Sequence, residues 1–323
     1  MGRRGRVLLV VGLVVAAFLA YEIATYFVAY TDDAYVRTDL VAVAPEVTGP
    51  IVSLYVHDNQ PVRKGDPLFT IDPVPFRLIV DQKQAEINEA KAQIVADQQA
   101  ISVAQDQHDA ATSAVTFAKA TQQRFSTLNT SGYMPRESLD RVTDELKRAL
   151  DSLSAAETAI AQARSVLAMH QATLALTEAE MGTAQWQLSR TQVISPTDGR
   201  INNLTVRVGD TATINVPLIG ILDAHAWRIM ANYKQYYLRG LRPGERAWVW
   251  LDSDPWRLHR AHIASIGQGI SRDPNEMKLL PYVAPTTDWI RLQHRFPVTI
   301  LLDEPPPGDE LFMGADARTV IFQ

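Results

Sequence analysis

The histidines are the side chains of this chain with the greatest capacity for chemistry, because the sequence contains no cysteine. His259 and His262 are three positions apart, which on a helix would turn both rings toward one metal ion. The residues around them form strand-like runs, and in a strand that offset places the two rings on opposite faces. His108 and His170 lie on two long helical segments at different distances from the turn between them, so they do not meet. We therefore predict structural roles for all four rings and no metal site.

Other sequence patterns of catalysis are absent. The chain has no Gly-rich phosphate loop, no nucleophile elbow and no metalloprotease helix. Trp248 and Trp250 alternate with apolar residues, which is more typical of packing or of an interface than of a ligand cage. The net charge is −5 over 323 residues, with acids and bases mixed along the chain, so no basic stripe faces a phosphate backbone. We predict a protein that is not an enzyme, carries no cofactor and does not bind nucleic acid.

The longest regular pattern is helical and covers residues 76–191, which are rich in Ala, Gln and Glu and nearly free of Gly and Pro. In its second part an apolar residue recurs every seven positions, and a mostly small residue follows each one three positions later, as in a coiled-coil seam. That series is Leu139, Leu146, Leu153, Ile160, Leu167, Leu174, Met181 and Leu188. The first part has a weaker version, interrupted by Asp97 and His108. A break at residues 129–135 contains Gly132 and Pro135, which predicts a fold-back into an antiparallel hairpin with arms of roughly 75 Å.

A repeat flanks this helical segment on both sides. The pattern G-x-I-x-x-L-x-V occurs at residues 49–56 and again 150 positions later at 199–206. A Pro precedes each copy, and a Gly-Asp pair follows it, at residues 65–66 and 209–210, which is punctuation typical of short strands. One such half buries little surface alone. We therefore predict that the two halves pack face to face as a small β-sandwich.

The N-terminal segment predicts a membrane anchor. Residues 7–29 are apolar apart from Glu22 and are long enough to cross about 30 Å of hydrocarbon as a helix. Arginines precede this segment and aspartates follow it, so the positive-inside rule places residues 1–6 in the cytoplasm and the remainder outside. A cleaved signal peptide is the alternative, but the apolar run is longer than usual and has no clear cleavage site. Glu22 is a candidate contact to a transporter helix, or it reaches the interface by snorkelling.

The last hundred residues contain short apolar runs between turn signals, which predict a small β-barrel. The whole chain is therefore predicted to be an elongated, modular α+β protein. Its expected segments are a cytoplasmic N-terminus (1–6), a transmembrane helix (7–29), a first lipoyl-like half with a connecting strand (30–75), a coiled-coil hairpin (76–191), a second lipoyl-like half (192–223) and a β-barrel (224–323).

This arrangement resembles the HlyD-type periplasmic adaptor family, also called membrane fusion proteins, and within it the branch of EmrA and the aromatic-acid efflux adaptors. The resemblance covers nearly the entire chain. It rests on an entry motif (TDDAYV, 31–36), on the two lipoyl-like halves (43–49 with 59–69, and 194–199 with 209–210) and on two barrel motifs (WIRL, 289–292, and RFPV, 295–298).

The resemblance implies a localisation and a set of partners. It implies an inner-membrane protein with its bulk in the periplasm, which binds an inner-membrane transporter and a TolC-like outer-membrane channel. It further implies a ring-forming homo-oligomer, a trimer or hexamer, that exports small molecules such as drugs or aromatic acids. Members that dock such channels carry Arg, then Leu, then Ser at the hairpin tip. Arg124 and Leu128 match this motif, whereas Pro135 stands where the family has Ser.

Three other functions remain open at this stage. A lipoyl or biotin carrier would need its modified lysine on a short turn between the halves, which the helical insertion replaces. A non-transport scaffold that tethers the inner membrane to another envelope component is the main alternative. Binding of the exported substrate by the adaptor itself, in apolar pockets near the barrel, is a third.

Overall fold

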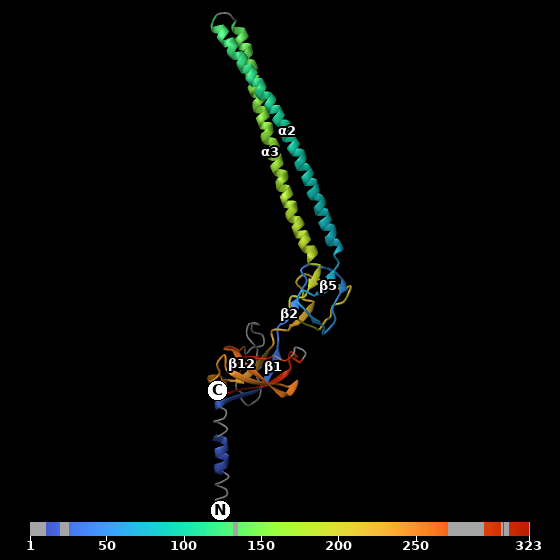
Figure 1. Ribbon diagram of the computed structural model, residues 1–323, viewed down its shortest axis with the longest axis vertical. Coiled ribbons are helices and arrows are strands. Elements are labelled where there is room, and N and C mark those ends of the chain that lie inside the picture. The colour runs from blue at the N-terminus through green and yellow to red at the C-terminus, as the bar shows by residue number, and fades with distance from the viewer. Residues whose placement is uncertain are drawn as a thin grey trace, which may run out of the picture.

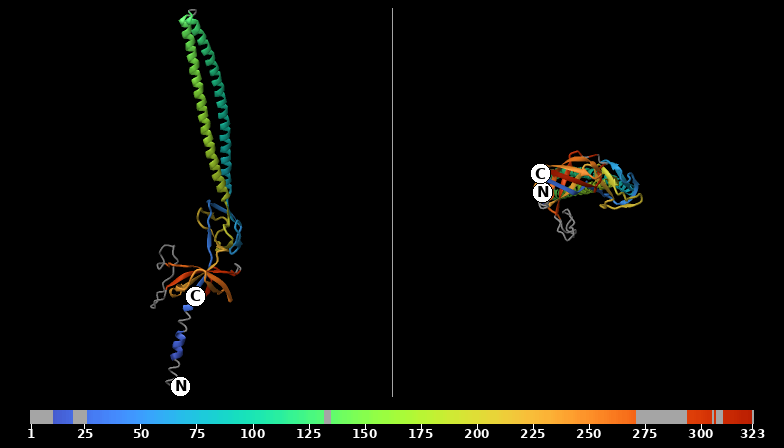
Figure 2. Two further views of the ribbon diagram at one scale, coloured as in Figure 1. Left: turned by 60° about the vertical axis from the view of Figure 1, so that its left-hand side comes forward. Right: turned by 90° about the horizontal axis from the view of Figure 1, so that it is seen from below.

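The modules follow one another along a single long axis in the computed structural model (Figures 1 and 2). The structure describes residues 11–19, 26–131, 135–270, 294–304, 306 and 310–322. A helical hairpin occupies one end, a β-sandwich lies at its base, and a β-barrel follows. The N-terminal segment leaves the barrel on the side opposite the hairpin. The order of modules agrees with the elongated architecture expected from the sequence.

The N-terminal segment differs in part from the predicted anchor. Residues 11–19 are helical and apolar, whereas residues 1–10 and 20–25, including Glu22, lie outside the described part of the chain. No helix among the described residues has both the length and the apolar character needed to cross a membrane. The predicted span also ended too late, because Val28 begins a barrel strand and Ala29 is fully buried in the barrel. Hydropathy does not distinguish the end of an apolar helix from the start of a buried strand.

The barrel is a closed antiparallel sheet with the strand order β1, β10, β13, β12, β11, β14. Its elements are β1 (Val28–Arg37), β10 (Arg228–Lys234), the short 3-10 helix η1 (Gln235–Arg239), β11 (Arg246–Leu251), β12 (Asp254–Ile266), β13 (Arg295–Leu302) and β14 (Asp316–Phe322). The first strand therefore comes from residues that we expected to connect to the sandwich. A strand sequence specifies which face is apolar, but it does not specify which sheet the strand joins.

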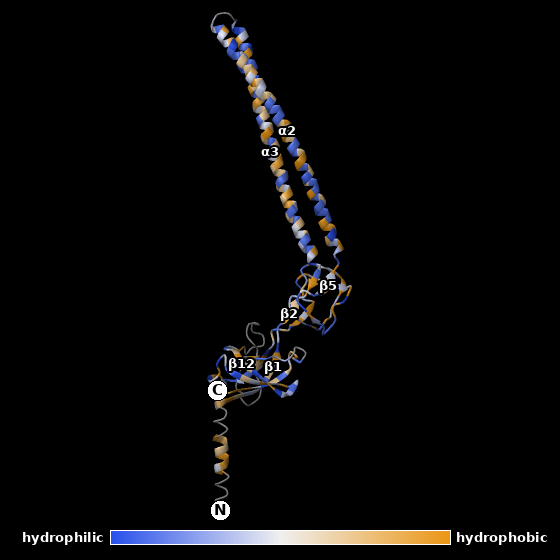
Figure 3. Cartoon of the chain, in the orientation of Figure 1, coloured by the Kyte–Doolittle hydropathy of each residue, from blue (hydrophilic) through white to orange (hydrophobic). Residues whose placement is uncertain are grey.

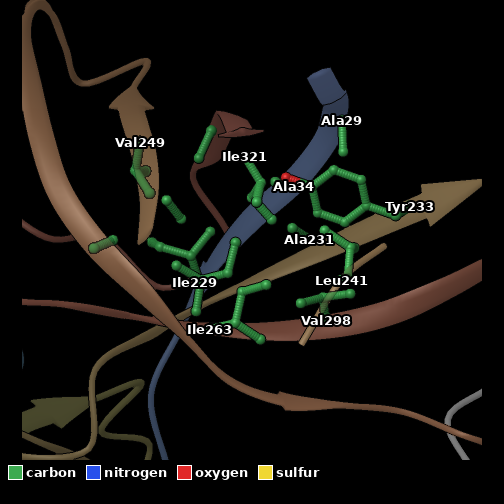
Figure 4. Close-up of a cluster of buried hydrophobic side chains, with 14 of the residues drawn as sticks. Ala29, Ala34, Ile229, Ala231, Tyr233, Leu241, Val249, Ile263, Val298 and Ile321 are labelled. Atoms are coloured by element: carbon green, nitrogen blue, oxygen red, sulfur yellow. The ribbon is translucent and has the colours of Figure 1, made fainter. Parts of the chain in front are cut away.

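Buried apolar side chains fill the barrel interior (Figure 4), and buried and partly buried residues alternate along strands β10 and β11. Along β11, Val249 is fully buried and its neighbours in sequence, Trp248 and Trp250, are only partly buried on the outer face. Tyr233 is also fully buried, and its hydroxyl lies 2.6 Å from the hydroxyl of Thr319. Burial raises the pKa of Tyr233 far above its usual value. The barrel core therefore holds a neutral phenol whose hydrogen bond is satisfied internally.

The sandwich consists of two four-stranded sheets, and each takes strands from both sequence repeats. One sheet has the order β2 (Leu40–Val43), β9 (Ile219–Asp223), β7 (Gly199–Asn202), β4 (Pro61–Val62). The other has the order β6 (Gln192–Ile194), β5 (Pro67–Ile71), β3 (Gly49–Leu54), β8 (Thr211–Ala212). The expectation that each repeat forms its own layer was wrong, because the halves interleave. Each short strand is thereby paired with at least one other strand, and the four inner strands β9, β7, β5 and β3 have neighbours on both sides.

The two repeats do share the same turn. Gly65 and Gly209 have positive φ values of 92° and 98°. In the first turn the Asp66 carboxylate accepts a 2.8 Å hydrogen bond from the backbone N–H of Arg63, and in the second Asp210 accepts the equivalent 2.8 Å bond from Arg207. Glycine is preferred at the left-handed position, and aspartate satisfies the backbone of the turn. The repeated Gly-Asp pair is thus explained by local geometry.

The hairpin is formed by α2 (Val74–Thr130, 57 residues) and α3 (Arg136–Ser189, 54 residues). At a rise of about 1.5 Å per residue, each helix is roughly 80–85 Å long. Figure 3 shows polar and apolar residues alternating along both helices. Pro75 lies in the first turn of α2. Backbone N–H groups in the first turn have no acceptor within the helix, so the missing N–H of proline costs no hydrogen bond there.

Candidate functional site

The hairpin is the candidate functional element of this protein. Its two helices contact each other along an apolar seam on each helix. Among the described residues, every buried hairpin residue occupies a position that the seven-residue pattern predicted. In α2 these residues are Ile87, Asp97, Ala104 and Ala111, and in α3 they are Val142, Thr177 and Ala184. The eight large apolar residues of the α3 series are each half-buried. Their incomplete burial reflects a seam of only two helices, which leaves part of each layer facing solvent.

A polar contact between Asp97 and His170, across the two helices, interrupts the apolar seam. The Nδ1 atom of His170 lies 2.5 Å from the Oδ2 atom of Asp97, and the Nε2 atom of Gln93 donates to Asp97 Oδ1 at 3.3 Å. Asp97 is 7% exposed, while the His170 side chain is 26% exposed. A carboxylate at this depth is stable only with a partner. His170 therefore supplies the charge or hydrogen bond that Asp97 requires.

Sequence reasoning missed this pair although the signal was present. Asp97 and His170 both stand at the small-residue position of their seams, and they lie almost equally far from the tip, 34 positions before Ser131 and 35 after Pro135. In an antiparallel hairpin, such positions face each other. His108 lies closer to the tip and contacts Asp109 on its own helix at 3.2 Å. The two histidines lie at different heights along the hairpin, as expected, and each has its own carboxylate partner.

Ion pairs near the base also join the helices. Lys83 lies 2.7 Å from Glu180 on the other helix and 2.8 Å from Glu86 on its own. Hydrogen bonds to Glu180 and then Glu86 raise the pKa of Lys83, and the bond from Lys83 lowers the pKa of Glu86. These side chains are solvated, so they contribute more to the register of the helices than to stability.

The hairpin tip presents the three residues that the family motif singled out. Arg124 is exposed, and its Nε atom lies 3.4 Å from the backbone oxygen of Ala120. Leu128 is 42% exposed, and Pro135 is exposed directly before the first turn of α3. Residues 132–134 lie outside the described part of the chain. Arg124 and Leu128 are four positions apart on α2, so they lie on the same side of the helix.

The root of the hairpin joins both helices to adjacent strands. Strand β5 leads into α2, strand β6 follows α3, and the two strands pair antiparallel. The N–H of Ile71 donates to the backbone oxygen of Thr191 at 2.8 Å, between the end of α3 and the start of α2. Arg190 lies 3.3 Å from Glu46, and Ser195 is buried. The hairpin is thereby joined to the sandwich through backbone hydrogen bonds.

The junction between sandwich and barrel has its own polar contacts. Thr38 donates a 2.6 Å hydrogen bond to the backbone oxygen of Asp223, and Asp39 lies 2.6 Å from Arg228. The hydrogen bond from Arg228 holds the pKa of Asp39 below its usual value. His225 lies 3.3 Å from Asp198, whose pKa is lowered first by a backbone hydrogen bond from Lys64 and then by His225.

On the outer face of the barrel, the entry motif and one barrel motif meet. Asp33 of β1 pairs with Arg295 of β13 and accepts a 3.1 Å hydrogen bond from Asn232 of β10. Thr31 donates to the backbone oxygen of Asn232 at 2.8 Å. The bulge in β1 between Thr31 and Ala34 turns Asp33 toward these partners. The motif at residues 289–292 lies outside the described part of the chain.

The two barrel histidines point to opposite faces, as predicted. His259 is 6% exposed, and its Nε2 atom has no hydrogen-bond partner among the described residues. Desolvation, followed by the charge of Arg257, lowers the pKa of His259. His262 is on the outside, 2.6 Å from Asp303. Within the part of the chain that the structure describes, no three His, Cys, Asp or Glu residues are placed to hold a metal ion.

Comparison with known proteins adds family information to this geometry. The family described as RND MFP, barrel-sandwich hybrid domain, matches residues 39–222, and the family described as AAEA-like beta-barrel domain matches residues 226–322. The Multidrug resistance protein MdtN of Shigella flexneri is 33% identical over 89% of this chain and 87% of its own length. The Uncharacterized protein YdhJ of Escherichia coli K12 is 30% identical over 96% of this chain and 95% of its own. The solved structure of MacA from Actinobacillus actinomycetemcomitans has a TM-score of 0.62 at 21% identity and covers 92% of this chain and 81% of that chain, which shows a shared fold.

Proposed function

This chain belongs to the HlyD-type membrane fusion protein family, and we propose that it acts as the periplasmic adaptor of a tripartite efflux system. The hairpin carries this proposal. It is a spacer of roughly 80 Å, far longer than the modules that support it, and it extends away from the N-terminal end of the molecule (Figure 1). Such a shape suits a bridge between two distant partners better than it suits a binding pocket.

We assign the outer end of the bridge to a TolC-like outer-membrane channel. Arg124 and Leu128 are exposed at the tip and share one side of α2, which is the placement that a contact with another helical tip requires. Pro135 stands where the family motif has Ser, and its side chain offers no hydroxyl. The docking of this chain would therefore depend on the charge of Arg124 and on the apolar contacts of Leu128 and Pro135.

The inner end is assigned to the inner membrane and its transporter. In this proposal residues 7–27 form a single-pass anchor with a cytoplasmic N-terminus, and Glu22 contacts a transporter helix. The apolar composition of residues 11–19 and the arginines at positions 3, 4 and 6 support this orientation. A ring of three or six copies would enclose the path of the cargo.

The cargo of the proposed system is a small molecule, a drug or an aromatic acid. The name of the MdtN relative and the match to the AAEA-like barrel support this class. The proposed mechanism is steric and mechanical and involves no catalysis by this chain. The paired strands β5 and β6 transmit movements of the sandwich to the hairpin, whose rigid seam then sets docking and sealing at the channel.

Photocrosslinking in living cells tests this assignment. A photoreactive residue at Arg124 should capture an outer-membrane channel, and one at Glu22 should capture a polytopic transporter. A photoreactive residue at Gln162, which is exposed halfway along α3, is the matched control and should capture no channel. Capture of neither partner from the expressed and inserted protein would contradict the adaptor function and favour the envelope scaffold.

A further inference from the structure

A cleft of about 1020 Å³ lies between the sandwich and the barrel. The sandwich contributes Arg200, Asn202 and Leu222 to its walls, and the barrel contributes Trp227, Phe312 and Met313. Its volume is at the upper end of the range found for small-molecule sites. Such sites also occur often at the boundaries between domains. The cleft is therefore large enough for a drug-sized molecule.

The barrel wall of the cleft presents apolar side chains in a fixed position. Phe312 is 60% exposed and Met313 is 44% exposed, in the turn that precedes β14. Hydrogen bonds between this turn and β1 hold it in place, since the N–H of Gly314 donates to the oxygen of Val36 at 2.8 Å and the N–H of Val36 donates to the oxygen of Ala315 at 2.8 Å. Leu311, only 4% exposed, anchors the turn in the barrel core. The apolar wall is thus preformed.

The remaining walls supply one aromatic face and a polar margin. Trp227 is half-buried against the barrel core, and the neighbouring Arg228 is tied to Asp39 across the junction. On the sandwich side, Arg200 donates a 2.8 Å hydrogen bond to the backbone oxygen of Asn59, and Asn202 is exposed. Amide groups at the margin offer hydrogen bonds to a neutral ligand without requiring it to carry a charge.

We propose that this cleft is a binding site for an uncharged aromatic molecule of drug size. The ligand would contact Trp227, Phe312 and Met313 through its rings, and its polar substituent would face Asn59 and Asn202. An aromatic ligand gains from ring and S–aromatic contacts beyond the burial of apolar area. Because the ligand would touch both modules, its binding would restrain the angle between sandwich and barrel. The site does not depend on the identity of the channel or of the transporter.

Photolabelling of the purified full-length chain in lipid nanodiscs tests the site. The probe is 4-hydroxybenzophenone, with 2-naphthol as the unlabelled competitor, and mass spectrometry identifies the labelled peptides. We expect saturable labelling of the segments around Trp227 and residues 311–314, abolished by excess competitor. Phe312→Ser and, separately, Met313→Ser should each weaken half-saturation about tenfold, because each removes a large apolar contact. Both side chains are exposed, so neither change disturbs the core.

A matched control distinguishes specific labelling of the cleft from nonspecific labelling of exposed apolar side chains. Trp256 is 97% exposed near the start of β12 and does not line the cleft. Trp256→Ser should leave the labelling unchanged. Labelling that does not saturate, that maps mainly to the hairpin, or that is equally strong in Phe312→Ser and Met313→Ser would overturn the proposal. Loss of channel capture at Arg124 would not affect this result, so the two proposals fail independently.

Discussion

Replacing His170 with leucine leaves the buried Asp97 carboxylate without its partner on the facing helix. Removal of one member of a buried ion pair costs about 3–5 kcal/mol, because the remaining charge stays desolvated. Two features reduce this cost here. The His170 side chain is 26% exposed, so water reaches one side of the pair, and Gln93 still donates to Asp97. We therefore expect His170→Leu to lower the local stability of the hairpin by about 2–3 kcal/mol.

The double variant Asp97→Leu/His170→Leu is the matched comparison. It replaces the pair with an apolar layer of the kind found elsewhere in the seam, and such replacements are often neutral or stabilising. We expect the double variant to be within about 1 kcal/mol of the unmodified chain or above it. Asp97→Leu alone should cost less than His170→Leu, because the His170 side chain, 26% exposed, remains accessible to water.

Hydrogen exchange followed by mass spectrometry measures the local stability of the hairpin in the full-length chain. Amides in residues 90–104 and 163–177 report the free energy of opening around the pair, whereas barrel amides serve as the internal reference. The reasoning would be refuted if His170→Leu exchanged as slowly as the unmodified chain. It would equally be refuted if the double variant lost as much protection as His170→Leu.

Three further predictions concern the other modules. Gly199→Ala places a Cβ atom 2.2 Å from the backbone oxygen of Leu222 and should destabilise the sandwich by about 1–3 kcal/mol in urea unfolding, whereas Gly182→Ala, with nothing within 4 Å, should not. Burial lowers the pKa of His259 in the folded barrel. Between the two pKa values, His259 therefore binds a proton in the unfolded chain but not in the folded one. Barrel stability should thus fall as the pH drops from about 6.5 toward the lowered folded pKa, and His259→Leu should flatten the dependence of the melting temperature on pH. Ile160→Asp inserts a charge into the seam and should abolish efflux while the protein still fractionates with membranes. Efflux at the normal rate would count against a rigid hairpin. The control is Gln162→Asp, at an exposed position of the same helix.

The hairpin illustrates how much local patterning determines. The series from Leu139 to Leu188 and the small residues three positions later predicted which side of α3 is buried, and the tip at Gly132 and Pro135 predicted where the chain folds back. These features follow from the 3.6-residue period of a helix and from the backbone preferences of Gly and Pro, which act over a few residues. The Gly-Asp turns of the two repeats are local in the same sense, since a positive φ and an adjacent carboxylate are sufficient to form them.

Other features depended on residues far apart in the chain. The interleaving of the two repeats, the insertion of Val28–Arg37 into the barrel, the pairing of Asp97 with His170 and the cleft beside Trp227 each join segments from different modules or helices. A sequence pattern specifies which side of an element is apolar, but it does not specify which partner covers that side. That choice is made by the packing of all the elements together, and only the tertiary structure records it.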